Sequence, residues 1–264
     1  MLRRMTEILL GQVTVRRRLP KMVGSGSVIA NPKAGGLRYL FRASEDFDPV
    51  LYKVARAIVK ANDVVWDVGG NIGLFAVSAA GLSGRGGAVY TIEADRDVFV
   101  LLLRTAKSQP SNHAPITCLN AAISNQCGAL QFNIAKRSRS ANFIAGFGST
   151  QTGGITETRL VPALTLDVLL SVFPAPKVLK IDVEGAELLA LQGAQDILSN
   201  VRPKIFIEVC EETSKGVAEL LRKYRYRIID GASLLEVVGD ESAPWDTVAI
   251  PMEMNLGAGS VSGG

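Results

Sequence analysis

Short apolar segments rich in β-branched residues alternate with helical patterns along most of this chain. Each apolar segment is nearly continuous, which is typical of strands buried on both faces of a parallel sheet. Strands that alternate with helices in this way predict a doubly wound α/β domain. The predicted strands are residues 64–68, 88–92, 116–120, 177–183, 204–209, 226–230 and 247–251. The predicted helices are residues 73–83, 97–108, 185–199 and 213–224, the second with Asp97 and the fourth with Thr213 as N-cap.

The first 62 residues do not follow this alternation. Residues 22–45 contain two apolar runs around an Asn-Pro and a Gly-Gly turn, a pattern that predicts a hairpin. At the N-terminus, arginines flank a short apolar patch that lacks the apolar region and cleavage site of a signal peptide. We interpret this patch as a basic helix, so residues 1–62 are expected to form a basic helix-and-hairpin extension.

A second irregular segment, residues 121–162, interrupts the main domain, which is predicted to span residues 63–252. It is rich in Ser, Gly, Thr and Asn, and only 130–134 and 158–162 resemble strands. A segment this long without strong structure is often a lid or a substrate-binding insertion. The last residues, 253–264, are rich in Gly and Ser and are predicted to be disordered.

Composition and charge exclude several classes of protein. No apolar run approaches the ~20 residues of a membrane span. The three cysteines lack CxxC spacing and indicate neither a disulfide framework nor a zinc site, so a cytoplasmic protein is expected.

The net charge is +4, but residues 1–60 carry 12 Lys and Arg against 4 Asp and Glu, which leaves the remainder at −4. A basic segment of this kind is usually a solvated face, and a weak contact with a membrane surface is the alternative. Aromatic residues are not interleaved with its arginines, which argues against nucleic acid as a partner.

The sequence DVGGNIG, residues 67–73, joins the first predicted strand to its helix. Glycine lets the backbone turn sharply or approach another group closely. The spacing differs from G-x-G-x-x-G, the pattern that places a pyrophosphate at a helix N-terminus. A carboxylate at Asp67 would repel pyrophosphate, whereas it suits the cationic sulfonium and ammonium groups of S-adenosylmethionine. The simpler alternative is that the glycines only allow the helix to pack on the sheet.

Two further acidic strand ends extend this candidate site. Glu93 ends the second predicted strand, where open α/β sheets place a carboxylate that binds ribose hydroxyls. NAD-binding proteins use the same arrangement, so Glu93 indicates an adenosyl ligand of either kind. Asp182 ends the fourth strand, and in a sheet ordered 3-2-1-4-5 it faces the same crevice as Asp67. Lys180 lies on the same face as Asp182 and either pairs with a carboxylate or takes part in the chemistry.

Six segments follow the order and approximate spacing of a known family. They are WDVGGNIGLFAV, YTIEAD, LNAAIS, LTLDVLL, LKIDVEGAELLALQGA and RPKIFIEVCEE, within residues 63–212. With these motifs the chain resembles the FkbM-type S-adenosylmethionine-dependent methyltransferases, and KIDVEGAE with its downstream LxGA is the most specific part. The resemblance implies the class I methyltransferase fold, a Rossmann-like three-layer α/β sandwich with a mostly parallel seven-stranded sheet and a reversed last hairpin. It also implies S-adenosylmethionine as the cofactor and O-methylation of a hydroxyl on a sugar, glycolipid or polyketide-type acceptor.

By position, the resemblance implies eight cofactor-binding residues. Glu93 would hold the ribose, and Ala121 and Ala122 would lie near the adenine. Gly70 departs from the alanine common in the family, which should loosen the turn without abolishing binding. The full set is Asp67, Gly69, Gly70, Asn71, Gly73, Glu93, Ala121 and Ala122.

An acceptor hydroxyl has to lose a proton, and a base helps. The one histidine, His113, precedes the third strand and is expected at the surface of the opposite edge. Asp182 and Glu208, which ends the fifth strand, are therefore the candidate catalytic residues. Glu184 could join Asp182 around Mg²⁺, but acidic residues at strand ends also cap helices, and no metal is predicted.

The insertion offers a second candidate site for an acidic or glycosidic acceptor. Its residues either line an acceptor pocket or form a solvated hairpin tip; they are Lys136, Arg137, Arg139, Phe143 and Phe147. Two other functions stay open at this point. One is an NAD-dependent oxidoreductase, and the other is a non-catalytic adapter or membrane-surface protein on the same fold.

Overall fold

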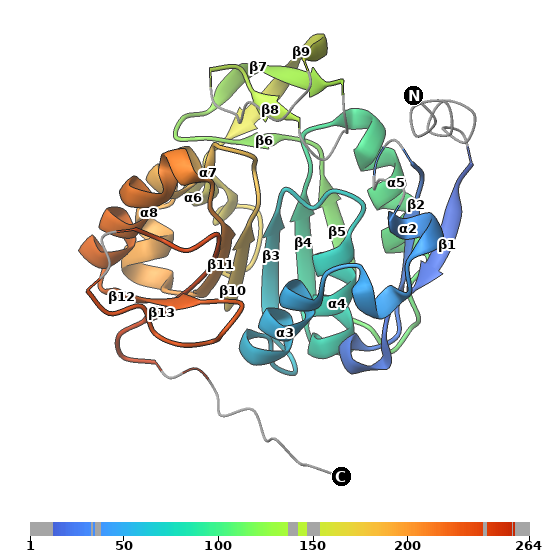
Figure 1. Ribbon diagram of the computed structural model, residues 1–264, viewed down its shortest axis with the longest axis horizontal. Coiled ribbons are helices and arrows are strands. Elements are labelled where there is room, and N and C mark those ends of the chain that lie inside the picture. Colours follow the sequence, from blue (N-terminus) through green and yellow to red (C-terminus); the bar gives the residue numbers. More distant parts are fainter. Residues whose placement is uncertain are drawn as a thin grey trace.

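A seven-stranded sheet forms the centre of the computed structural model, which describes residues 13–32, 34, 38–136, 142–146, 154–239, 242–254 and 256 (Figure 1). Its strands are β3 (Val64–Val68), β4 (Ala88–Ile92), β5 (Ile116–Leu119), β10 (Val178–Ile181), β11 (Lys204–Glu208), β12 (Tyr226–Asp230) and β13 (Asp246–Pro251). They lie in the order β12-β13-β11-β10-β3-β4-β5. Only β13 runs antiparallel to its neighbours, β11 and β12. The predicted sheet with a reversed last hairpin, and hence the class I methyltransferase fold, is confirmed.

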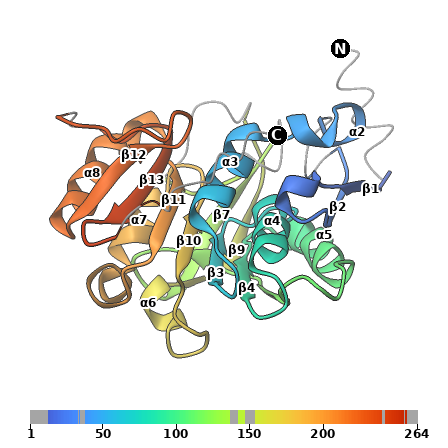
Figure 2. The same cartoon turned by 90° about the horizontal axis from the view of Figure 1, so that it is seen from below.

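Helices cover both faces of this sheet, because its strands are apolar on both sides (Figure 2). These helices are α3 (Pro49–Ile58), α4 (Leu74–Ser83), α5 (Arg96–Lys107), α6 (Leu166–Leu169), α7 (Glu187–Gln192) and α8 (Glu211–Lys223). The first three pack over a core that includes Val65 and Phe206. The last three pack over a second core that includes Trp66 and Leu179. The result is a three-layer α/β/α sandwich.

The switch point of the sheet lies between β3 and β10, which are adjacent although more than a hundred residues separate them in sequence. In their register Asp67 is paired directly with Lys180. The amide of Asp182 extends this pairing by donating to the carbonyl of Val68 over 3.0 Å. Ligands of open α/β sheets bind at the carboxyl ends of such strands, and the two predicted acidic positions meet there.

The described strands of the predicted insertion, which extend to Leu164, form a second sheet that lies across the carboxyl edge of the first (Figure 1). Its strands are β6 (Ala122–Ile123), β7 (Gly128–Ala135), β8 (Phe143–Ile144) and β9 (Ile155–Leu164), in the order β6-β9-β7-β8. Phe132, Ile144 and Val161 form a small core that includes Ala186 at the start of α7. The two strands predicted here are the centres of β7 and β9, and the segment is more regular than its composition indicates.

The N-terminal hairpin is formed by different strands from those predicted. β1 (Val15–Arg18) pairs with β2 (Ser27–Ala30), whereas α2 (Arg38–Phe41) is helical where the second strand was expected. The turn uses Gly24 at φ 88° and Ser25 at φ 58°. A Cβ at Gly24 would lie 2.5 Å from the Cα of Gly81, so the turn is set by close packing on α4. The predicted basic helix falls largely on residues 1–12, which are outside the described residues, whereas the arginines after the apolar patch lie in strand β1.

Three predicted helix boundaries were wrong for local reasons. Asp95, not Asp97, caps α5, because its carboxylate accepts from the amide of Asp97 over 2.9 Å. Thr213 does not cap α8 but lies inside it. The helix predicted at 185–199 ends with α7, and a separate π-helical turn follows at Ile197–Val201. The carboxylate of Asp167 accepts from the first amides of that segment and so starts it anew.

The start of the predicted disordered tail is held to the domain. Glu253 accepts a hydrogen bond from Arg202 Nη2 over 2.9 Å, and the carbonyl of Met254 accepts from Arg227. Most of the remaining tail lies outside the described residues. Within the part of the chain that the structure describes, no helix combines the length and apolar character needed to cross a membrane.

Candidate functional site

The glycines of the 67–73 loop are required by contacts within the protein. Gly69 has φ 76°, and a Cβ there would lie 1.7 Å from the carbonyl oxygen of Asp182. At Gly70 a Cβ would lie 2.0 Å from Thr91 Oγ1. At Gly73, with φ 96°, the nearest atom would be 3.0 Å away on Leu102. The loop is therefore pressed between the ends of β4 and β10, and this packing supports the simpler of the two explanations for its glycines.

Backbone amides at the start of this loop already have acceptors. The amides of Gly69 and Gly70 both donate to the carbonyl of Ile92 over 2.9 Å. The amide of Asn71 donates to Glu93 Oε2 over 2.8 Å. A phosphate group binds at a helix N-terminus through free amides of this kind, so these three do not form a pyrophosphate cradle.

Glu93 connects this loop to the turn after β4. Its second oxygen, Oε1, accepts from the amide of Asp95 over 2.8 Å. Burial raises the pKa of this carboxyl from the ordinary 4.5 to about 7, although the two amides act in the opposite direction. Each oxygen keeps a lone pair beyond its amide bond, so the group can accept further hydrogen bonds at the pocket that it borders.

A pocket with about 590 Å³ of empty volume, counting space open to solvent, lies at the carboxyl edge of β3, β4 and β10. We call it the nucleoside pocket. The predicted residues that line it are Gly69, Asn71, Glu93, Ala121, Ala122, Asp182 and Glu184. Four other predicted residues do not line it, namely Asp67, Gly70, Gly73 and Glu208.

Asp67 lies beneath the loop and is fully buried. Its Oδ2 accepts from Thr91 over 3.3 Å, and its Oδ1 is 3.8 Å from Lys180 Nζ. Burial raises the pKa of Asp67, and the charge of Lys180 opposes that rise. Asp67 is thus part of a buried ion pair at the switch point, which fits the predicted pairing of Lys180 with a carboxylate.

Lys180 holds the acidic strand ends together. Its Nζ donates to Asp182 Oδ2 over 2.9 Å, as predicted for a residue on the same face. Burial alone would lower the pKa of Lys180, but the carboxylates of Asp182, Asp67 and Glu208 raise it above its ordinary value. Lys180 therefore stays charged and serves as the counter-ion of this cluster.

Two neighbours of Asp182 have raised pKa values. The charge of Asp182, followed by burial, raises the pKa of Glu208 to about 8. Burial, followed by the charge of Asp182, raises the pKa of Glu184 to about 8. Near neutral pH both carboxyls hold their protons for much of the time. Perturbed carboxyls beside a pocket are typical of acid–base sites.

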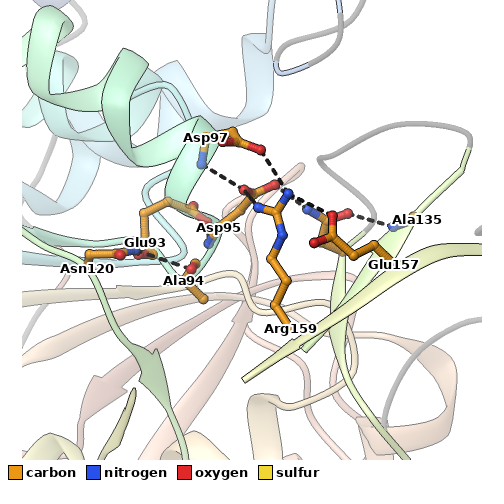
Figure 3. Close-up of polar contacts among 9 residues, drawn as sticks. Glu93, Ala94, Asp95, Asp97, Asn120, Ala135, Glu157 and Arg159 are labelled. Atoms are coloured by element: carbon orange, nitrogen blue, oxygen red, sulfur yellow. Dashed lines mark hydrogen bonds and ion pairs between the residues drawn. The ribbon is translucent and has the colours of Figure 1, made fainter. Parts of the chain in front are cut away.

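A polar network that the sequence did not indicate ties the insertion sheet to this site (Figure 3). Arg159 of β9 reaches Asp95 over 3.2 Å and Asp97 over 3.0 Å at the start of α5. Asn142 donates to the other oxygen of Asp95 over 2.7 Å. These partners lie 47 to 64 positions apart in sequence, and no local pattern marks the pairs.

Several other candidates lie away from the nucleoside pocket. His113 is buried, not exposed as predicted, because its Nε2 is 2.8 Å from the carbonyl of Gly24 in the hairpin turn that covers it. Lys136 is exposed, and Arg137, Arg139 and Phe147 of the predicted acceptor site are outside the described residues. Among the described residues, no three His, Cys, Asp or Glu side chains are grouped so that they could hold a metal ion.

Comparison with known proteins gives one relative by sequence and more distant ones by structure. Residues of this chain are 28% identical over 141 positions to Hexuronic acid methyltransferase AglP of Haloferax volcanii, a match that spans 53% of each chain. The similarity thus covers about half the length of that relative. Among solved structures, the chain is similar to Methyltransferase FkbM from Methylobacillus flagellatus KT, with 18% identity, 76% and 54% coverage and a TM-score of 0.41. It is also similar to M. jannaschii TYW2 in complex with AdoMet, with 12% identity, 89% and 84% coverage and a TM-score of 0.45.

The family profile described as Methyltransferase FkbM domain matches residues 67–228. This span begins at the buried aspartate of β3, includes the glycine loop, the insertion sheet and the acidic end of β10, and ends in β12. It covers more than half of the chain, and the chain therefore belongs to the FkbM family of S-adenosylmethionine-dependent methyltransferases.

Proposed function

We propose that this chain transfers the methyl group of S-adenosylmethionine to a hydroxyl of a saccharide-type small molecule, with residues 63–252 as the methyltransferase domain. One observation carries the proposal: a single pocket joins Glu93, a carboxylate placed for ribose hydroxyls, to Asp182, an acidic strand end across the switch point. A relative described as a hexuronic acid methyltransferase supports a sugar-type acceptor.

The residues fit S-adenosylmethionine better than a dinucleotide. Three loop amides are already bonded within the protein, which leaves a pyrophosphate without those donors. Asn71 Oδ1 is a buried acceptor without a hydrogen-bond partner, and Asn71 borders the pocket, so it suits the ammonium group of the methionine end. Glu93 would accept from the ribose, and the short side chains of Ala121 and Ala122 would leave room for the adenine.

The predicted residues outside the pocket have a supporting role in this proposal. Asp67 is the buried partner of Lys180, so it would hold the loop and the end of β10 in place without touching the cofactor. Gly69 lines the pocket, whereas Gly70 and Gly73 let the loop pack tightly beneath it.

When bound, the cofactor supplies a methyl group on a sulfonium and leaves as a neutral thioether. The protein therefore contributes mainly orientation and removal of the acceptor proton. We assign the base to Asp182, because it borders the pocket and Lys180 orients its carboxylate. Glu208 would support Asp182 from outside the pocket, since the charge of Asp182 is the main cause of the raised pKa of Glu208.

The test is to incubate the protein with S-adenosylmethionine and a panel of neutral hexosides and hexuronides, and to identify methylated products by mass spectrometry. We expect an added methyl ether on at least one saccharide. In the Asp182→Asn variant, turnover should fall at least 100-fold, the lower range of general-base effects, while S-adenosylhomocysteine still binds. Full turnover in Asp182→Asn would show that Asp182 is not the general base. Methylation of nitrogen or carbon with every saccharide unmodified would contradict the proposed reaction.

A further inference from the structure

The insertion sheet borders the nucleoside pocket with three side chains. They are Phe132 of β7, Asn142 before β8, and Ile144 of β8. Phe132 and Ile144 share a small core with Ala122 and contact Ala94. The same core also includes Ala186, and Val183, which follows Asp182, packs against it. The insertion therefore borders the pocket from the end of β4 to the end of β10, and its contact with Ala122 brings it next to the part proposed for the adenine.

The amide of Asn142 is fixed from both ends. Its Nδ2 donates to Asp95 Oδ2 over 2.7 Å, and its Oδ1 accepts from the amide of Ala135 over 2.8 Å. The side chain is 7% exposed, so these bonds are shielded from water. A primary amide carries two donor hydrogens and two acceptor lone pairs. Each atom of Asn142 thus keeps one unused position beside the pocket.

Asp95 places this amide in fixed relation to Glu93. The backbone amide of Asp95 donates to Glu93 Oε1, and its side chain accepts from Asn142. The same side chain also accepts from Arg159 (Figure 3). The carboxylate is 1% exposed. Asp95 bonds both to Glu93, the carboxylate proposed for the ribose, and to the amide of Asn142. It therefore fixes the distance between these two groups.

We infer that Asn142 is a specificity-determining residue that recognises the adenine of the cofactor through one donor and one acceptor, with Phe132 and Ile144 as the apolar wall beside the ring. An asparagine amide pairs in this way with the donor and acceptor edge of adenine in nucleic-acid complexes. A 6-oxopurine presents an acceptor where adenine presents a donor, so it does not match. This inference rests on the proposed use of S-adenosylmethionine and names what the insertion contributes to it. Asp95 and Arg159 act as positioning residues.

The test is calorimetric titration with S-adenosylhomocysteine and with its inosine analogue, in which the 6-amino group is replaced by oxygen. The wild-type protein should bind the adenine compound at least tenfold more tightly, the lower end for a bidentate amide pair. In Asn142→Ala, affinity for the adenine compound should fall about tenfold or more, and the preference over the inosine compound should disappear. This readout does not depend on turnover or on the identity of the acceptor.

Asn133→Ala is the matched control. Asn133 is also a buried asparagine of the insertion sheet, but it bonds to Thr158 and does not border the pocket. The Asn133→Ala variant should keep the wild-type preference for the adenine compound over the inosine compound. If Asn142→Ala unfolds, the wild-type preference alone still decides, since equal binding of both compounds overturns the inference. A preference retained in Asn142→Ala also overturns it. If wild-type protein binds neither compound, the proposed function itself fails.

Discussion

At the scale of single residues, the site depends on how closely β3 and β10 approach each other. Gly69 has no room for a side chain, since its missing Cβ would fall on the carbonyl of Asp182. The pairing of Asp67 with Lys180 lies directly beneath. A tight backbone contact and a buried ion pair thus hold the loop and the acidic strand end at one fixed separation.

Gly69→Ala should strongly destabilise this contact. A positive φ costs an L-residue roughly 1–2 kcal/mol, and relief of the clash should cost about 1–3 kcal/mol more. Gly239→Ala is the matched control, because Gly239 has φ 75° and no atom within 4 Å of the built Cβ. Urea unfolding of both variants measures the difference. Equal losses in the free energy of unfolding would contradict a close contact at Gly69.

Lys180→Met should leave buried carboxylates without a counter-ion. Breaking a buried pair by removing one partner typically costs about 3–5 kcal/mol. The loss in the free energy of unfolding should be smaller at pH 5 than at pH 8. Burial already raises the pKa of Asp67, so this carboxyl is protonated more readily at the lower pH and the unpaired charge is removed. Lys177→Met, an exposed lysine one residue before β10, is the control. A pH-independent loss in the free energy of unfolding would argue against an ionised Asp67.

At the scale of elements, we propose a role for the insertion sheet that its sequence does not indicate. Its composition predicts a loosely structured acceptor lid, but β7 and β9 form its longest pairing and β8 adds a short edge strand. Arg159 joins it to α5, and Phe132 and Ile144 join it to the pocket wall. These contacts support our proposal that the insertion borders the cofactor.

Deletion of residues 136–150 distinguishes an acceptor lid from a wall of the cofactor pocket. If the insertion is only an acceptor lid, its removal should leave cofactor binding intact. If β8 and Asn142 form part of the pocket wall, their loss should lower the affinity for S-adenosylhomocysteine at least tenfold. Calorimetry measures the affinity, and circular dichroism checks that the central sheet, with its own two cores, remains folded. Unchanged affinity in a folded deletion variant would restore the interpretation as an acceptor lid.

The sequence predicts some elements well because their signals are local. Buried β-branched runs mark all seven central strands, and the motifs at Glu93 and Asp182 place both residues at the pocket. The network of Asp95, Asn142 and Arg159 has no local signal, since it depends on how a second sheet docks. The cap of α5 was missed for a related reason: two aspartates compete for one position, and the hydrogen bond that selects Asp95 is visible only in the fold.

At the scale of the whole molecule, the carboxyl edge of the sheet concentrates acidic groups that hold their protons unusually well. The pKa of Glu93 is raised to about 7 by burial. That of Glu184 is raised to about 8 by burial and that of Glu208 to about 8 by the charge of Asp182. Lys180 is the counter-ion of Asp182, Asp67 and Glu208 at this edge. A cationic cofactor bound there would add positive charge where the fold lacks it.

Without ligand, the free energy of unfolding should fall as pH rises from about 4.5 to about 8. The folded state keeps protons on these carboxyls over this range. The unfolded state releases them near 4.5, and a state that binds more protons loses stability as pH increases. Urea unfolding at pH 5 and pH 8 measures the slope. Replacement of Glu184 and Glu208 by Gln should flatten it, whereas Glu219→Gln on the exposed side of α8 should not. A slope unchanged by the first two replacements would contradict the raised pKa values.

The central claim is that the pocket at the switch point binds the adenosyl part of S-adenosylmethionine through Glu93. The most direct measurement is calorimetric titration of the wild-type protein and of Glu93→Gln with S-adenosylhomocysteine and with NAD. The account predicts micromolar binding of S-adenosylhomocysteine by the wild type, at least tenfold weaker binding by Glu93→Gln because a charged hydrogen bond is lost, and no binding of NAD. Binding of NAD in preference to S-adenosylhomocysteine, or full affinity in Glu93→Gln, would contradict it.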